Sequence, residues 1–175
     1  MNNTGSNSFS VRRLAQMALL IALEIIFSRF LSIATPIVKI SFSLLPLAAM
    51  AILYGPAYAA AGGAIADLLG AVLFPIGAYF PGFTLTAALT GAVYGGFLQK
   101  NRATVVRTLC AVLLINFVIQ LGLDTLWIVM ITDKAFLALL PVRALKCALM
   151  VPIQVLGIKS LDVLLKTTRR TAAVG

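Results

Sequence analysis

The chain has 175 residues, of which 61% are hydrophobic and 11% are charged, and it contains no histidine. A soluble domain of this size has too little interior to bury so much apolar surface. The absence of imidazole also removes a common base and metal ligand of hydrolases and metalloenzymes. The formal net charge of +9 comes from basic residues that lie mostly between apolar runs, as in membrane proteins. They do not form the basic patch with interleaved aromatic residues that would indicate a nucleic-acid partner.

Apolar segments of roughly the length that crosses a bilayer follow one another along the chain. The second segment stops at a Gly-Pro turn, and the third and fourth are separated by residues 75–82, where two prolines and two glycines prevent a continuous helix. We therefore predict an all-α, six-helix transmembrane bundle in residues 12–166, between a flexible N-terminal segment, 1–11, and a basic C-terminal tail, 167–175. The predicted spans are residues 14–33, 42–54, 57–74, 83–98, 105–131 and 137–165.

The distribution of basic residues predicts the orientation of the bundle. Six spans place both termini on one side, and most basic residues fall on that side: Arg12, Arg13, Lys100, Arg102, Arg107, Lys166, Arg169 and Arg170. The opposite side contains few, namely Lys39, Lys134 and, at a span end, Arg29. By the positive-inside rule, both termini are cytoplasmic. The predicted location is the bacterial cytoplasmic membrane, crossed several times and in contact with lipid.

Polar side chains on the fifth span form a stripe. Asn116, Gln120, Asp124 and Trp127 are spaced four, four and three residues apart, which puts them on one face of a helix. Amides and a carboxylate can read the donor and acceptor edge of a heterocycle, and an indole can stack on its flat face. A hydrogen-bonded seam between helices is the alternative, and we favour the ligand site.

Cations at the predicted outer side suggest an anionic substrate. Arg143, Lys146 and Gln154 share a face of the sixth span, and Arg29 and Lys39 flank the loop after the first span. Basic side chains can also snorkel to lipid headgroups, so the pattern leaves this alternative open. Two acidic residues inside predicted helices, Glu24 and Asp67, are either pocket groups or buried partners of a cation.

Small residues recur at helical spacing in three spans, where they allow helix backbones to approach closely in lipid. The faces of the third and fourth spans predict internal packing: Ala59, Gly63, Ala66 and Gly70, and Ala87, Gly91 and Gly95. The first span has a small-xxx-small step from Ala18 to Ala22. By itself this step also favours internal packing over a docking face for a partner.

Several strings in the chain resemble the folate family of substrate-binding subunits of energy-coupling-factor (ECF) transporters. Residues 28–33 (SRFLSI) and 37–46 (IVKISFSLLP) are similar to the start of these subunits. Residues 66–71 (ADLLGA) and 73–84 (LFPIGAYFPGFT) are similar to their middle section, and the second of these strings is long and specific. The resemblance extends over about residues 12–165.

The resemblance implies a non-enzymatic six-helix subunit that captures a vitamin from outside and binds no cofactor itself. Its partners are a transmembrane coupling protein and two ATP-binding cassette ATPases, which use ATP so that the vitamin is released inside. In such subunits a small-xxx-small motif on the first helix contacts the coupling protein. Here that motif corresponds to Ala18 and Ala22, so the resemblance favours a docking role for them.

The family implies folate as the substrate, and folate combines a flat pterin ring with a glutamate tail that has two carboxylates. We expect the outer cations to hold the tail: Arg29, Lys39, Arg143 and Lys146. The polar stripe is expected to read the ring: Asn116, Gln120 and Asp124. Aromatic side chains are expected to stack on the ligand or close over it: Tyr79, Phe80, Phe83 and Trp127.

Three other functions remain open at this point. The first is a subunit of the same system for another vitamin, such as riboflavin, thiamine or a pyrimidine precursor. The second is a membrane enzyme with Asp67 or Asp124 as a base, although the sequence has no paired carboxylates at catalytic spacing. The third is a proton-driven carrier that uses Glu24 or Asp67. Nothing in the sequence resembles a nucleotide-binding loop, so the chain is not expected to hydrolyse ATP itself.

Overall fold

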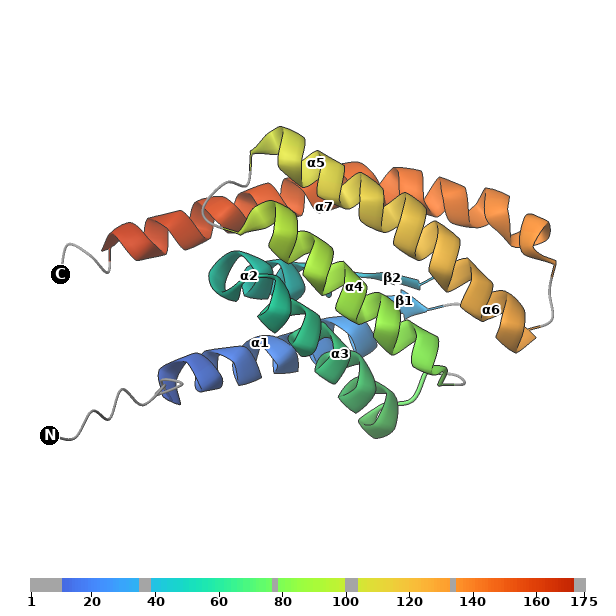
Figure 1. Ribbon diagram of the computed structural model, residues 1–175, viewed down its shortest axis with the longest axis horizontal. Helices are drawn as coiled ribbons and strands as arrows, with labels where there is room; N and C mark the ends of the chain where they lie inside the picture. The colour runs from blue at the N-terminus through green and yellow to red at the C-terminus, as the bar shows by residue number, and fades with distance from the viewer. Residues whose placement is uncertain (1–10, 35–38, 77–78, 100–103, 133–134, 172–175) are drawn as a thin grey trace, which may run out of the picture.

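The computed structural model describes residues 11–34, 39–76, 79–99, 104–132 and 135–171, and these are almost entirely helical (Figure 1). Side chains outside the described set include those of Arg12, Lys39, Lys100, Arg102, Lys134, Arg169 and Arg170. Residues 105–132 form one continuous helical run with a π-helical middle section, η1. The elements are α1 (Val11–Arg29), β1 (Ser32–Ala34), β2 (Lys39–Ser41), α2 (Leu44–Tyr54), α3 (Pro56–Leu73), α4 (Pro81–Leu98), α5 (Val105–Leu113), η1 (Leu114–Leu123), α6 (Asp124–Thr132) and α7 (Phe136–Thr171).

The first predicted span is shorter than the sequence suggested, because it is followed by a small hairpin. Helix α1 ends at Arg29, and β1 pairs with β2 as antiparallel strands in which Ile33 lies opposite Ile40. A proline at position 36 disfavours helix in the residue before it. Apolar residues suit a strand as well as a helix, so hydropathy alone did not separate the two.

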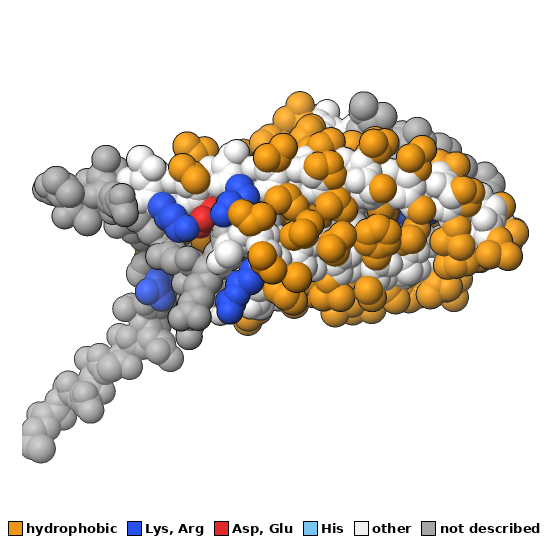
Figure 2. All heavy atoms as spheres, turned by 90° about the horizontal axis from the view of Figure 1, so that it is seen from above, with side chains coloured by type: hydrophobic (Ala, Val, Ile, Leu, Met, Phe, Trp, Pro, Cys, Tyr) orange, Lys and Arg blue, Asp and Glu red, His pale blue; other side chains and the backbone are white. Residues whose placement is uncertain are grey.

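Large apolar side chains cover the outside of the molecule, as expected for a membrane protein (Figure 2). Leu145, Leu149 and Leu156 of α7 are each more than 60% exposed, whereas Gln154 on the same helix is buried. Within the described residues, three helical segments are long and apolar enough to cross a membrane: Pro56–Leu73, Val105–Thr132 and Phe136–Thr167. Helix α2 is apolar but shorter.

Helix α2 lies at the centre of the bundle, against α1, α3, α4 and α7. Its sequence contains no charged residue, and Ala48, Met50 and Ala51 are completely buried. A helix that is apolar on all sides has no surface suited to water, so it is stable only when other helices or lipid surround it. The other helices are therefore arranged around α2.

Helices α3 and α4 pack with their backbones in close contact. A methyl group added at Gly91 would lie 2.3 Å from the Ala59 carbonyl oxygen, and one added at Gly95 would lie 2.2 Å from Cα of Pro56. Gly63 faces the Ala87 carbonyl in the same way. The predicted packing role of these small residues is therefore confirmed.

Both ends of the described chain lie at the same end of the molecule (Figure 1), and the basic side chains visible in Figure 2 gather toward that end. There the Tyr54 hydroxyl donates a hydrogen bond to Gln16 Oε1 at 2.7 Å. Lys166 Nζ lies 2.6 Å from the carboxylate of Asp162. Helix α7 continues to Thr171, into the segment that the sequence assigns to a tail.

Close α3–α4 packing predicts that Gly91→Ala lowers the free energy of unfolding by about 1–3 kcal/mol, because the new methyl group forces the two backbones apart. Thermal unfolding of the purified protein in detergent should show this as a lower midpoint. Gly96→Ala is the matched control, since a methyl group there has nothing within 4 Å and alanine favours a helix. Equal effects of the two substitutions would contradict the packing role.

Candidate functional site

A cavity of about 690 Å³ is lined by residues of α1, α2, α3, α4, η1, α6 and α7. This volume is within the range of roughly 300–1,000 Å³ that is usual for sites of drug-sized ligands. Charged side chains inside a membrane domain are unfavourable unless they face such a cavity or a partner. Among the described residues, the charged side chains that line this cavity are Glu24, Arg29, Asp67, Asp124, Arg143 and Lys146.

Two of these cations are held by a single residue of η1. Arg143 Nη2 donates to the backbone oxygen of Gln120 at 2.9 Å, and Lys146 Nζ donates to the side-chain oxygen of the same residue at 2.7 Å. These two bonds use one donor from each cation, and both side chains line the cavity. Gln120 thus fixes two positive charges side by side on the cavity wall.

Asn116 lies in a polar seam between η1 and α7. Its Nδ2 donates to the Gln154 side-chain oxygen at 2.7 Å and to the Val112 carbonyl at 2.8 Å. The Cys147 thiol contacts the Asn116 carbonyl at 3.4 Å. Asn116 is completely buried and is not among the residues that line the cavity, whereas Gln154 is. The stripe predicted from spacing therefore divides into an interhelical seam at Asn116 and a cavity wall at Gln120 and Asp124.

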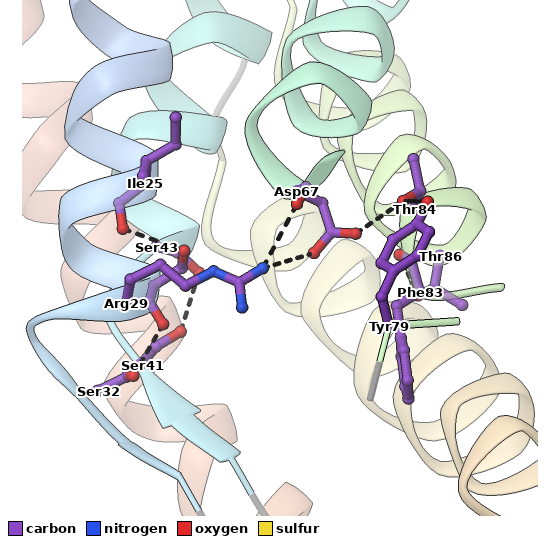
Figure 3. A network of polar contacts seen from close by, with 11 residues as sticks. Ile25, Arg29, Ser32, Ser41, Ser43, Asp67, Tyr79, Phe83, Thr84 and Thr86 are labelled. Carbon is purple, nitrogen blue, oxygen red and sulfur yellow. Dashed lines mark hydrogen bonds and ion pairs between the residues drawn. The ribbon is translucent and has the colours of Figure 1, made fainter. Parts of the chain in front are cut away.

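Arg29 reaches the cavity from the end of α1 (Figure 3). Its guanidinium lies across α3 at Gly70, where a methyl group would come within 2.8 Å of Nε. Arg29 Nη2 is 3.7 Å from Asp67 Oδ1, and Asp67 Oδ2 accepts a hydrogen bond of 2.8 Å from the Thr84 hydroxyl. The Tyr79 hydroxyl is 3.0 Å from that of Thr84. This network connects α1, α3, α4 and the segment before α4.

The aromatic residues predicted to contact a ligand occupy two positions. Tyr79 and Phe83 line the cavity. Phe80 packs instead against Trp127, with ring centroids 5.4 Å apart, and neither lines the cavity. Gly82 makes this packing possible, since a methyl group there would lie 2.5 Å from the indole. Trp127 is therefore behind the wall rather than in it.

The cavity brings together seven of the predicted site residues: Arg29, Tyr79, Phe83, Gln120, Asp124, Arg143 and Lys146. The side chain of Lys39 lies outside the described residues, although its backbone pairs with Ala34 in the hairpin. Lining residues that were not predicted include Thr86, Tyr94 and Gln154. Only Gln154 had a usable signal, because it lies two turns after Lys146 on the same helix face. Hydroxyl groups within an apolar helix give no comparable signal.

Comparison with known proteins identifies the family. Residues 8–162 match the family model described as the S component of an ECF-type riboflavin transporter. The chain is 44% identical over 142 residues to the folate transporter FolT of Clostridium novyi (strain NT), covering 81% of this chain and 83% of that protein. It is 33% identical over 150 residues to the folate transporter FolT of Leuconostoc mesenteroides subsp. mesenteroides, covering 82% and 80%.

A solved structure is similar over nearly the whole fold. The crystal structure of FolT bound with folic acid superposes with a TM-score of 0.83 at 38% identity, covering 88% of this chain and 93% of that one. The resemblance read from residues 28–84 is thus confirmed by a family model, by relatives and by a fold. The chain belongs to the S-component family of ECF-type transporters.

Proposed function

We propose that this protein is the folate-binding S component of an ECF-type uptake transporter. The observation that carries the proposal is a cavity of suitable volume, with three cations among its described lining residues, in a chain with 44% identity to a folate transporter. Membership of this transporter family supports neither of two alternatives raised from the sequence, a membrane enzyme or a stand-alone proton-driven carrier. ATP would be used by partner ATPases, and a coupling protein would connect them to this subunit.

Folate fits the charges of the cavity better than riboflavin does. Riboflavin carries no carboxylate, whereas the glutamate tail of folate carries two. Lys146 retains donors beyond the one used on Gln120, Arg143 lines the cavity beside it, and the described contacts of Arg29 with Asp67 are long. These three cations would hold the tail. Gln120 and Asp124 would read the pterin edge, and Tyr79 and Phe83 would stack on the ring.

The Asp124 carboxylate is suited to accept hydrogen bonds from a ring. It lines the cavity, and its Oδ1 atom is buried without a hydrogen-bond partner among the described residues. An unsatisfied buried acceptor is unfavourable, so a ligand donor at this position would stabilise the complex. Asn116 would act indirectly, by holding Gln154 at the cavity wall.

The coupling protein would dock on the exposed side of α1. Ala18 and Ala22 are exposed and lie on one face with Ala15, whereas Met17 and Glu24 point inward and are buried. Small side chains on a lipid-facing surface permit another helix to approach closely. The step from Ala18 to Ala22 is therefore free for a partner, as the family resemblance suggested.

We expect substitution of a cavity cation to weaken folate binding. Arg143→Gln removes charge-assisted hydrogen bonds worth roughly 1.5–3 kcal/mol each, so calorimetric titration should show affinity lower by about ten- to a hundred-fold. Arg107→Gln is the control, because Arg107 is an exposed cation at the start of α5. Unchanged folate affinity in both Arg143→Gln and Lys146→Gln would exclude the tail assignment. If the wild type binds riboflavin but not folate, folate is excluded as the substrate.

A bulky residue on the α1 face should block transport without blocking binding. Ala18→Trp or Ala22→Trp is expected to abolish folate uptake by cells, since close helix approach does not tolerate an indole. The purified variants should retain the folate affinity of the wild type. Ala148→Trp, at an exposed alanine of α7, should transport normally. If folate binding and uptake fall together, these alanines do not form a docking face.

The proposed topology has six spans with both termini in the cytoplasm, as the charge distribution predicts. A cysteine introduced by Asn101→Cys should be protected from an impermeant thiol reagent added to intact cells. A cysteine introduced by Asp133→Cys should be labelled. Cys110→Ser and Cys147→Ser provide the background for both variants. Labelling in the reverse pattern would require the opposite orientation.

A further inference from the structure

Arg29 is held in place mainly by the shape of its surroundings. Its side chain is 9% exposed and lies where Gly70 has no side chain. The described contacts of Nη2 are long, at 3.4 Å to the Asp67 backbone oxygen and 3.7 Å to Asp67 Oδ1. The Nε atom is buried and has no hydrogen-bond partner among the described residues. A guanidinium has five N–H donors, so this one retains unused donors beside the cavity.

Asp67, the carboxylate nearest to Arg29 among the described residues, is bonded more closely to another helix. The Thr84 hydroxyl donates to Asp67 Oδ2 at 2.8 Å, and the Tyr79 hydroxyl is 3.0 Å from the Thr84 oxygen. Because Thr84 has a single hydroxyl proton, which goes to Asp67, Tyr79 must donate to Thr84. Figure 3 shows this chain of contacts between α4 and Arg29. Asp67 Oδ2 is thus fixed by α4, while Oδ1 faces Arg29 without the roughly 2.7–2.9 Å contact of a charge-assisted bond.

We propose that Asp67 is a counterion for Arg29 in the empty cavity and that a substrate carboxylate competes with it for the guanidinium. This rests on the proposed function, in which Arg29 holds part of the anionic tail. A buried cation without a nearby anion is strongly unfavourable, so Asp67 stabilises the unliganded protein. The same negative charge repels an incoming carboxylate. Asp67 is therefore a specificity-determining residue. It limits binding to ligands whose carboxylate approaches Arg29 more closely than the Asp67 carboxylate does.

The Asp67→Asn substitution leaves the other charged residues of the cavity unsubstituted. Glu24 lies on α1, Asp124 on α6, and Arg143 and Lys146 on α7. Asp124→Asn removes one negative charge from the cavity, as Asp67→Asn does, but at the position proposed to bind the pterin ring. Asp124→Asn is therefore a contrasting variant, in which affinity should fall for any ligand with the pterin ring.

Titration of Asp67→Asn with two ligands tests the proposal. Asparagine keeps an oxygen to accept from Thr84 and removes only the charge. We expect folate to bind roughly fivefold or more tightly than to the wild type, and the neutral dimethyl ester of folate to bind with unchanged affinity. The melting temperature without ligand should fall, and the increase caused by folate should be larger than in the wild type. In an Arg29→Gln background, Asp67→Asn should no longer raise folate affinity.

Several results would overturn the proposal. If Asp67→Asn binds both folate and its ester more weakly, Asp67 contacts the pterin ring or supports the fold, and the proposal is wrong. Unchanged folate affinity, with melting lowered equally in the presence and absence of folate, would leave Asp67 a purely structural role. If Arg29→Gln does not fold, Gly70→Ala serves as the background instead. Its methyl group displaces the Arg29 side chain, and the charges of Arg29 and Asp67 are both kept. The gain from Asp67→Asn should be smaller in that background, and a full gain there contradicts the proposal. A wild-type protein that binds neither ligand would refute the proposed function itself.

Discussion

Close contact between the backbones of α3 and α4 is the constraint on which the rest of this structure depends. In lipid, helices gain nothing by burying apolar side chains against each other, so association relies on tight packing of small residues. Gly63, Gly91 and Gly95 each lie against backbone of the facing helix, where a methyl group would not fit. This rigid pair presents Asp67 to the cavity from α3, and Thr84 of α4 holds its carboxylate. Without this backbone contact, Asp67 and Thr84 would not be held at a fixed distance from each other.

The cavity reverses the usual arrangement of a soluble protein. Polar and charged side chains point inward, while leucines of α7 cover the outside. Among the described lining residues, three cations face three carboxylates: Arg29, Arg143 and Lys146 face Glu24, Asp67 and Asp124. A near balance of charge makes it less unfavourable to keep these groups away from water before a ligand arrives. Selectivity then depends on which of them a substrate can engage.

Two residues of the π-helical section η1, four positions apart, contribute to two neighbouring structures. A π-helix bonds each residue to one five positions away, which gives a wider turn than an α-helix. In such a helix residues four apart still lie close to one line along the axis, so Asn116 and Gln120 both face α7. Asn116 turns toward Gln154, and Gln120 turns toward Arg143 and Lys146. The seam and the ligand wall are therefore adjacent along η1 and α7.

The sequence by itself determined the membrane class, the helical architecture and the family, because hydropathy, prolines and the 73–84 string are local signals. It also predicted internal packing of the small-residue faces of α3 and α4, since small residues at helical spacing need no knowledge of their partner, but only the structure shows that the two faces meet. Only the tertiary structure decided that 32–34 form a strand, that Asn116 and Trp127 lie behind the wall, and that Asp67 faces Arg29. Apolar residues suit strand and helix alike, and the spacing of a stripe does not show which of its members reach a cavity. A partner 38 positions away in the chain leaves no trace in local spacing, because helix packing alone brings the two residues together.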